Sequence, residues 1–173
     1  MVIFVVVLAL LFVEFNLRST KSSIEVESKA FENGGRIPKV YTCGGRDISP
    51  PLSWSKVNGA MSYVVIVEDP DAPGGTFIHW VLYNIPAEVT SLPENLPKKA
   101  VTEYGYQGVN DFGRVGYGGP CPPPGKAHRY VFHVYALDSK LSLNPGATAS
   151  QVLYAMQGHV IAEGSITGLY GRG

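Results

Sequence analysis

The sequence has no excess of charge of either sign, because 14 Lys and Arg residues balance 14 Asp and Glu residues in a chain of 173. A protein that holds nucleic acid by its phosphates needs a basic face. We therefore expect no nucleic-acid partner. The chain also has no internal repeat, heptad or low-complexity tract. Its length suits one domain of ordinary size that can bury a substantial core.

Motifs of common catalytic and metal chemistry are absent as well. No G-x-S-x-G segment presents a serine as a nucleophile. Neither a close His-x-x-x-His spacing nor a Cys-x-x-Cys spacing predicts a metal site. We expect no catalytic residue, no metal and no cofactor. A hydrolase that uses Asp69 and His79 as acid and base stays open as a lesser alternative, as does a metal held by distant ligands.

One long apolar run occurs, at the N-terminus, over Val2–Val13. It is too short for a comfortable membrane span of roughly 20 residues, and it resembles the apolar core of an export signal. No Lys or Arg precedes it and no A-x-A cleavage site follows. We expect residues 1–21 to be a leader that exports or anchors the chain, and residues 22–173 to form the domain. A buried N-terminal strand is the alternative, and a cytoplasmic location stays open.

After the leader, β-branched and aromatic runs alternate with turn residues, and the chain holds 20 Gly and 13 Pro. Three runs bounded by turn residues are typical of strands, over residues 61–68, 79–85 and 128–137. One helix is expected from Thr148, because Thr148 and Gln151 have the spacing of a capping box and Gly158 can end it. The pattern predicts a mostly β sandwich with a minor helical part.

The segment 102–129 has little periodicity but many Gly, Tyr and Pro residues. A loop of that length inside a compact domain is usually functional or disordered, and its aromatic and proline content favours order. Gly118 and Gly119 allow backbone N–H groups to turn toward a ligand, and Pro120 restricts the chain beside them. We expect this segment to form one wall of a site.

Two histidines begin strands beside turns rich in Gly and Pro. His79 follows the aspartate turn 69–75, and His128 lies two residues before Tyr130, so these two side chains share a strand face. A carboxylate on one imidazole nitrogen fixes the tautomer and favours the protonated ring, whose second N–H can donate to an anion. The pattern predicts that both histidines, Tyr130 and a carboxylate of the turn form an anion site. Purely structural histidines are the alternative.

Three segments carry a resemblance to a known family: "YTCGGRDISPPLSW", "DPDAPGGTFIHWVLYNIP" and "YGGPCPPPGKAHRYVFHVYALD". In this order they resemble the signature segments of phosphatidylethanolamine-binding proteins, most of all the bacterial and archaeal Raf kinase inhibitor-like branch. The likeness extends from about Ile24 to the C-terminal "GLYGR". It implies an antiparallel β-sandwich of that family's type, with one or two short helices.

The resemblance also implies a small anion pocket at one end of the sandwich. Its residues would be Asp69, Asp71, His79, Gly119, Pro120, His128 and Tyr130. We expect a non-catalytic binding protein for phosphate, phosphorylated head groups such as phosphoethanolamine, or carboxylates. An inhibitor or regulator of a protease or kinase, acting through protein contact, is the alternative. A homodimer is expected from the resemblance alone.

The chain has two cysteines, Cys43 and Cys121. Both lie in Gly-rich or Pro-rich segments assigned to the same end of the sandwich, and an exported domain would meet an oxidising compartment. We expect a disulfide between them, with two free thiols as the alternative. Metal binding is disfavoured because two isolated cysteines lack a short paired spacing.

Overall fold

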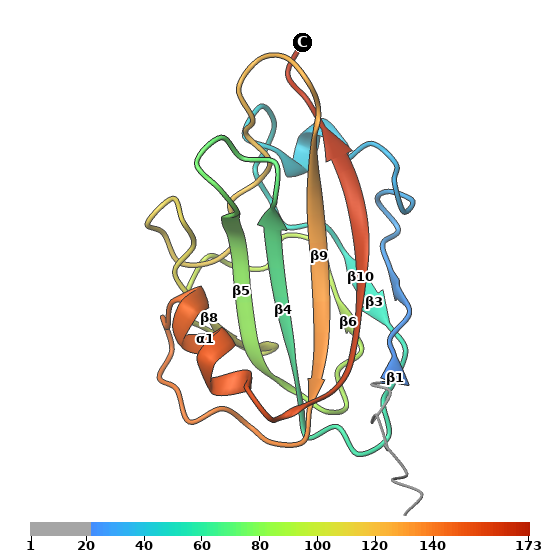
Figure 1. The fold of residues 1–173 in the computed structure, drawn as a ribbon, viewed down its shortest axis with the longest axis vertical. Helices are drawn as coiled ribbons and strands as arrows, with labels where there is room; N and C mark the ends of the chain where they lie inside the picture. The colour runs from blue at the N-terminus through green and yellow to red at the C-terminus, as the bar shows by residue number, and fades with distance from the viewer. Residues whose placement is uncertain (1–21) are drawn as a thin grey trace, which may run out of the picture.

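The computed structural model describes residues 22–173, which form two β-sheets packed face to face (Figure 1). The larger sheet has the order β1 (Ser22–Ser23), β10 (Val160–Tyr170), β9 (His128–Leu137), β4 (Ser62–Asp69), β5 (Phe77–Pro86), β8 (Gly105–Gln107) and β7 (Val101–Thr102). The smaller sheet has the order β2 (Val26–Glu27), β3 (Leu52–Trp54) and β6 (Ser91–Leu92). All neighbouring strands are antiparallel except β1, which is parallel to β10. The predicted mostly β sandwich is confirmed.

An aromatic core fills the space between the sheets. The Trp54 ring of β3 packs against Tyr63 of β4, with 5.6 Å between ring centroids. Trp80 of β5 and Tyr130 and Phe132 of β9 are fully buried in the same cluster. Burying one such side chain contributes about 1.5–3 kcal/mol. The three central strands are therefore held firmly, and their ends can position functional side chains.

One α-helix, α1 (Ala149–Met156), covers part of the outer face of the larger sheet (Figure 1). Thr148 accepts a hydrogen bond from the Gln151 backbone N–H, and the Gln151 side chain accepts one from the Thr148 N–H, which confirms the predicted capping box. Val152 and Met156 are buried in the cluster that includes Val64 of β4. A short 3-10 helix, η1 (Lys39–Tyr41), lies in the chain between β2 and β3.

The strand β10 was not delimited from the sequence, although it pairs with β9 along its whole length. Gly164 interrupts the β-branched pattern that would have marked it. A Cβ atom at Gly164 would lie 1.8 Å from the Ile24 carbonyl oxygen, so the N-terminal segment packs directly on this backbone. Glycine inside a strand is typical of such close approach.

The expected export or membrane anchoring through an apolar leader is corrected. Within residues 22–173, no helix is long and apolar enough to cross a membrane. The predicted leader, residues 1–21, lies outside the described residues.

Candidate functional site

The predicted site residues lie at the edge of the larger sheet where β4 ends and β5 and β9 begin, at the upper end in Figure 1. Asp69 is the last residue of β4, His79 the third of β5 and His128 the first of β9. Because β4 lies between β5 and β9 and is antiparallel to both, its end meets their beginnings. The topology thus brings three distant segments of the chain to one place.

A β-bulge determines where His79 points. Val67 pairs with Trp80 and Glu68 with Ile78, so His79 is the extra residue on β5. Strict alternation would send His79 and Trp80 to opposite faces. The bulge instead turns the His79 ring toward the inner face, where its centroid lies 5.2 Å from that of Tyr130. Bulges that re-aim a side chain are frequent beside functional sites.

His128 and Asp69 form a buried pair, whereas the sequence had associated the aspartate turn with His79. His128 Nδ1 donates to Asp69 Oδ2 at 2.7 Å, and the two residues are only 9% and 3% exposed. The other oxygen of Asp69 accepts the backbone N–H of Asp71 at 2.8 Å. The carboxylate therefore fixes the His128 tautomer and leaves Nε2 as the nitrogen available to a ligand.

His79 is oriented by a backbone group rather than by a carboxylate. Its Nδ1 donates to the Gly118 carbonyl oxygen at 2.7 Å, and the Gly118 N–H donates back to the His79 carbonyl at 2.9 Å. Burial lowers the pKa of His79 below its usual value, and the Gly118 carbonyl and the Asp69 charge only partly oppose this. The His79 ring is therefore predominantly neutral near pH 7, with a lone pair on Nε2.

The Tyr130 hydroxyl gives the strongest indication that this cluster binds a ligand. It is buried and makes no hydrogen bond of ordinary length and angle within residues 22–173, although it lies close enough to the Asp69 carboxylate for a weak contact to help raise its pKa. Burial, with a further contribution from the Asp69 charge, raises the pKa of Tyr130 well above its usual value, so the group remains an O–H donor. Buried polar groups without a partner are rare and cost about 1–3 kcal/mol. An unpaired donor beside two histidines is what a ligand site requires.

Three other predicted residues serve the site indirectly. Both oxygens of Asp71 accept hydrogen bonds from Arg129, which lowers the pKa of that carboxyl far below its usual value. The Gly119 N–H donates to Asp47 Oδ1 at 2.6 Å, and the Pro120 carbonyl accepts the Cys43 N–H at 3.1 Å. The expectation that glycine N–H groups face the ligand is thus corrected, because the N–H groups of Gly118 and Gly119 are both used within the protein.

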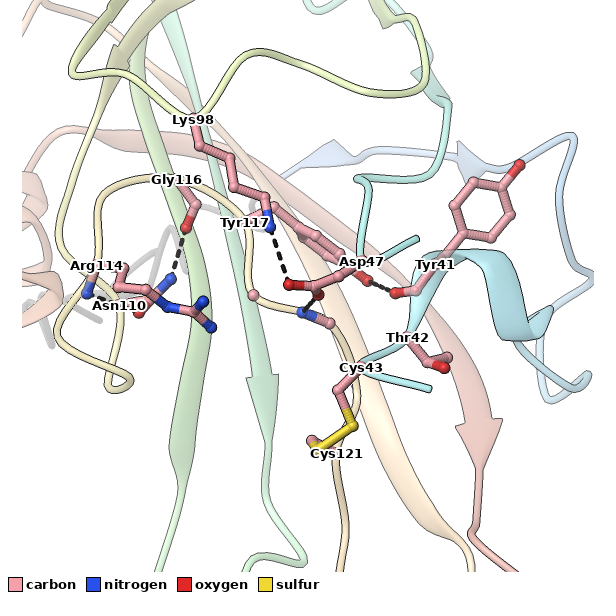
Figure 2. Close-up of polar contacts among 12 residues, drawn as sticks. Tyr41, Thr42, Cys43, Asp47, Lys98, Asn110, Arg114, Gly116, Tyr117 and Cys121 are labelled. Carbon is pink, nitrogen blue, oxygen red and sulfur yellow. Dashed lines mark hydrogen bonds and ion pairs between the residues drawn. A yellow bond between two sulfur atoms is a disulfide. The ribbon is translucent and has the colours of Figure 1, made fainter. Parts of the chain in front are cut away.

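We call residues 118–124 of the long loop the Gly-Pro wall. A set of polar contacts that the sequence did not predict supports this wall, as Figure 2 shows. Asp47 accepts the Gly119 N–H and also pairs with Lys98 Nζ at 2.9 Å. The buried Tyr117 hydroxyl donates to the Tyr41 carbonyl at 2.8 Å. Asp47 has a positive φ of 55°, a conformation that aspartate tolerates better than most residues. A lone aspartate in a turn carries no sequence signal for this role.

A disulfide joins Cys43 to Cys121 beside these contacts (Figure 2). This is the pairing that we expected from the assignment of both segments to one end of the sandwich. Together with the bond between the Cys43 N–H and the Pro120 carbonyl, it ties the turn after η1 to the Gly-Pro wall. The wall is therefore held covalently as well as by hydrogen bonds.

We expect Gly119→Ala to lower the free energy of unfolding by about 1–3 kcal/mol, because a Cβ atom there overpacks the wall. It would lie 2.4 Å from the Tyr41 carbonyl oxygen and 2.7 Å from Asp47 Oδ1. Urea unfolding measures the change. Gly74→Ala in the exposed aspartate turn is the control, because its Cβ would meet nothing within 4 Å. Equal stability of the two variants would contradict the packing argument.

No group of three or more His, Cys, Asp or Glu side chains suited to a metal ion occurs in the described part of the chain. The residues that the site does bring together are two imidazoles, one phenol and one carboxylate, namely His79, His128, Tyr130 and Asp69. Aromatic rings cover one side of this cluster. Phe77 and the partly exposed Phe112 pack against the His79 ring, with centroids at 5.1 Å and 5.3 Å.

Comparisons with known proteins identify the family to which this fold belongs. Residues 27–171 match the family model described as phosphatidylethanolamine-binding protein. A UPF0098 protein of Aquifex aeolicus is 52% identical over 166 residues, which cover 94% of this chain and 97% of that protein. A second UPF0098 protein, from Methanothermobacter thermautotrophicus, is 51% identical over 152 residues, covering 87% of this chain and all of that protein.

Two solved structures have the same fold. The crystal structure of CT736 from Chlamydia trachomatis, a putative phosphatidylethanolamine-binding protein homologue by its title, has a TM-score of 0.79 and 43% identity over 88% of this chain and 99% of that chain. That of E. coli YbcL, described as a new member of the mammalian PEBP family, has a TM-score of 0.81 and 36% identity, covering 87% and 99% of the two chains. The match to the phosphatidylethanolamine-binding protein family model supports a binding role and leaves the ligand unspecified. The chain belongs to the phosphatidylethanolamine-binding protein family.

Proposed function

We propose that the chain is a non-catalytic binding protein whose pocket at Asp69, His79, His128 and Tyr130 takes a small anion: phosphate, a phosphorylated head group or a carboxylate. The observation that carries the proposal is the Tyr130 hydroxyl, a buried donor that makes no hydrogen bond of ordinary geometry within residues 22–173 and lies beside Asp69 and His79. Its high pKa keeps it protonated, so it can donate to an anion at any physiological pH.

The two histidines supply the other contacts. Each uses Nδ1 for a protein acceptor, the Gly118 carbonyl or the Asp69 carboxylate, so Nε2 is the nitrogen that remains for a ligand. A neutral ring offers an acceptor there, and a protonated ring offers a donor. A phosphoryl group that carries one proton suits both states, because it can donate to a neutral ring and accept from a charged one.

Binding without turnover is favoured because no nucleophile is evident: both cysteines form the disulfide, and the sequence has no G-x-S-x-G segment that would present a serine. Here Asp69 is occupied by His128 and by the Asp71 N–H. The Nδ1 atoms of both histidines are likewise bound to acceptors that orient the rings. The groups thus form a fixed cradle for an anion.

Tyr130→Phe tests the proposal, because it removes only the unpaired hydroxyl and leaves the buried ring. A hydrogen bond to a charged partner is worth about 1.5–3 kcal/mol, so we expect phosphate to bind about tenfold more weakly or worse. Calorimetric titration of the purified protein with inorganic phosphate gives the affinities. Unfolding curves should show that the variant is at least as stable as the parent, because an unpaired buried donor is lost.

Tyr135→Phe is the matched control, because Tyr135 lies on the same strand but on the outer face of the sheet. It removes the same atom outside the pocket and should leave phosphate affinity unchanged. Equal affinities of the two variants would remove Tyr130 from the site. A parent protein that binds neither phosphate nor a phosphorylated compound would overturn the proposed function itself.

A further inference from the structure

A groove at the same end of the larger sheet as the candidate site contains two arginines. It is a groove of about 370 Å³ lined by Arg36, Gly125, Ala127, Leu169, Tyr170, Gly171, Arg172 and Gly173. Arg36 and Arg172 belong to its lining, no aspartate or glutamate does, and the two guanidinium charges outnumber the single α-carboxylate of Gly173. We name this surface the arginine groove. Its cationic character does not follow from the overall composition, which is electrically balanced.

Backbone contacts hold Arg172 in place. Its Nε donates to the Pro122 carbonyl at 2.5 Å, and its own carbonyl accepts the Gly125 N–H at 3.2 Å. Pro124 forms a parallel bridge with it. The guanidinium is therefore fixed against the Pro-rich wall. Within residues 22–173 no carboxylate pairs with Arg172, so its terminal nitrogens keep their donors for another anion.

Arg36 reaches the groove from the other side. The segment around it pairs with the end of β10, where the Leu169 N–H donates to the Gly35 carbonyl and the Ile37 N–H donates to the Leu169 carbonyl, each at 2.8 Å. Arg36 itself is exposed, and it makes no ion pair with any residue that the structure describes. A fixed backbone thus presents a second unpaired cation.

Two residues of the arginine groove are neighbours of His128 in the candidate site. Ala127 lines the groove and directly precedes His128. Tyr170 also lines it and is the cross-strand partner of His128 in the β9–β10 pair, so the two side chains lie on the same face. The charge of Arg172 also lowers the pKa of Tyr130 somewhat, against the larger effect of burial, so its field reaches the pocket.

The geometry points to a ligand with two anionic groups, one held by Tyr130 and the two histidines and the other lying in the arginine groove between Arg36 and Arg172. This inference rests on the proposed function and narrows its ligand class. A phosphorylated compound with a second acidic group fits both surfaces. A phosphorylated amine fits less well, because its ammonium group would face two guanidinium groups.

Three small phosphate monoesters test this, since they share the phosphoryl group and end in a neutral methyl, a cationic ammonium or an anionic carboxylate group. Ethyl phosphate is neutral there, phosphoethanolamine is cationic and phosphoglycolate is anionic. Exposed charge pairs are worth about 0.2–1 kcal/mol, which is about a 1.4- to fivefold change in affinity for each arginine. We expect calorimetry to rank phosphoglycolate tightest and phosphoethanolamine weakest, and added salt to reduce the differences.

Arg36→Gln and Arg172→Gln should each lower the ratio of phosphoglycolate affinity to ethyl phosphate affinity, and the double variant should bring it close to one. We use this ratio because Arg172 also influences the phosphoryl group, which both compounds share. An effect on that group changes both affinities alike and leaves the ratio unchanged. Lys140→Gln is the matched control: it removes one exposed positive charge just beyond the far end of β9 and should leave the ratio unchanged.

The possible failures are distinguishable. If ethyl phosphate and phosphoglycolate bind the parent protein equally, or if the double variant keeps the parent's ratio, the arginine groove takes no second anion and the inference is overturned while the phosphoryl pocket stands. If phosphoethanolamine binds tightest, the inference is equally wrong. If no phosphate compound binds, both the inference and the proposed function fail.

Discussion

Loss of the Cys43–Cys121 disulfide is expected to lower the free energy of unfolding by about 4–5 kcal/mol in the chain-entropy model. The bridge spans 78 residues of sequence, so in the unfolded chain it closes a long loop and removes much conformational freedom. Urea unfolding of the parent protein, with and without reductant, measures the change. Cys43 is exposed, so a reductant can reach the bridge without prior unfolding.

The double variant Cys43→Ser, Cys121→Ser separates the bridge from other effects of the reductant. It should unfold at the same urea concentration as the reduced parent, and reductant should not destabilise it further. Thiol titration of the unfolded, unreduced parent should find no reactive thiol. Two reactive thiols per chain, or a loss of less than about 1 kcal/mol on reduction, would contradict the stabilising role.

Sulfate affinity is expected to fall by at least about tenfold between about pH 5 and pH 8, a range that spans the usual histidine pKa of about 6.5. Sulfate has no proton to give, so His79 Nε2 can bind it only as the donor of a protonated ring. Burial lowers the pKa of His79 in the free protein, so binding must take up a proton. The affinity therefore increases as the pH falls, until the lowered pKa of the free ring is reached.

His79→Gln isolates this contribution, because the glutamine amide offers a donor that does not titrate. The variant should have a flatter profile of sulfate affinity against pH than the parent. His133→Gln is the control, since His133 lies on the outer face of β9, where its Nε2 contacts Glu68 at 3.1 Å. A parent profile that is flat from about pH 5 to pH 9 would rule out the protonated grip.

Local signals explain the part of the fold that was predictable. The strands over Ser62–Asp69, Phe77–Pro86 and His128–Leu137 were found because β-branched and aromatic runs end there at turn residues. The helix was found from its capping box. The strand β10 was not delimited, because Gly164 interrupts its β-branched pattern. The glycine is needed there for close contact with Ile24, which is distant in the sequence.

Local signals also predicted part of the candidate site. His128 and Tyr130 share a face by strand alternation, and the aspartate turn does hold His128 through Asp69. The orientation of His79 was beyond such reasoning, because it depends on a bulge that only the pairing with β4 creates. The role of Asp71 as the partner of Arg129 depends on β9 lying beside the turn, which is also a tertiary effect.

By itself, the sequence determined the family, the main strands, the helix start and which side chains could meet, because spacing, turn chemistry and composition are properties of the chain. Only the tertiary structure decided which polar groups are left for a ligand. The Gly118 and Gly119 N–H groups are used internally, the Tyr130 hydroxyl makes no hydrogen bond of ordinary geometry within residues 22–173, and Arg36 and Arg172 line one groove. Hydrogen-bond satisfaction depends on every neighbour in space, so it could not be derived from residues taken in order.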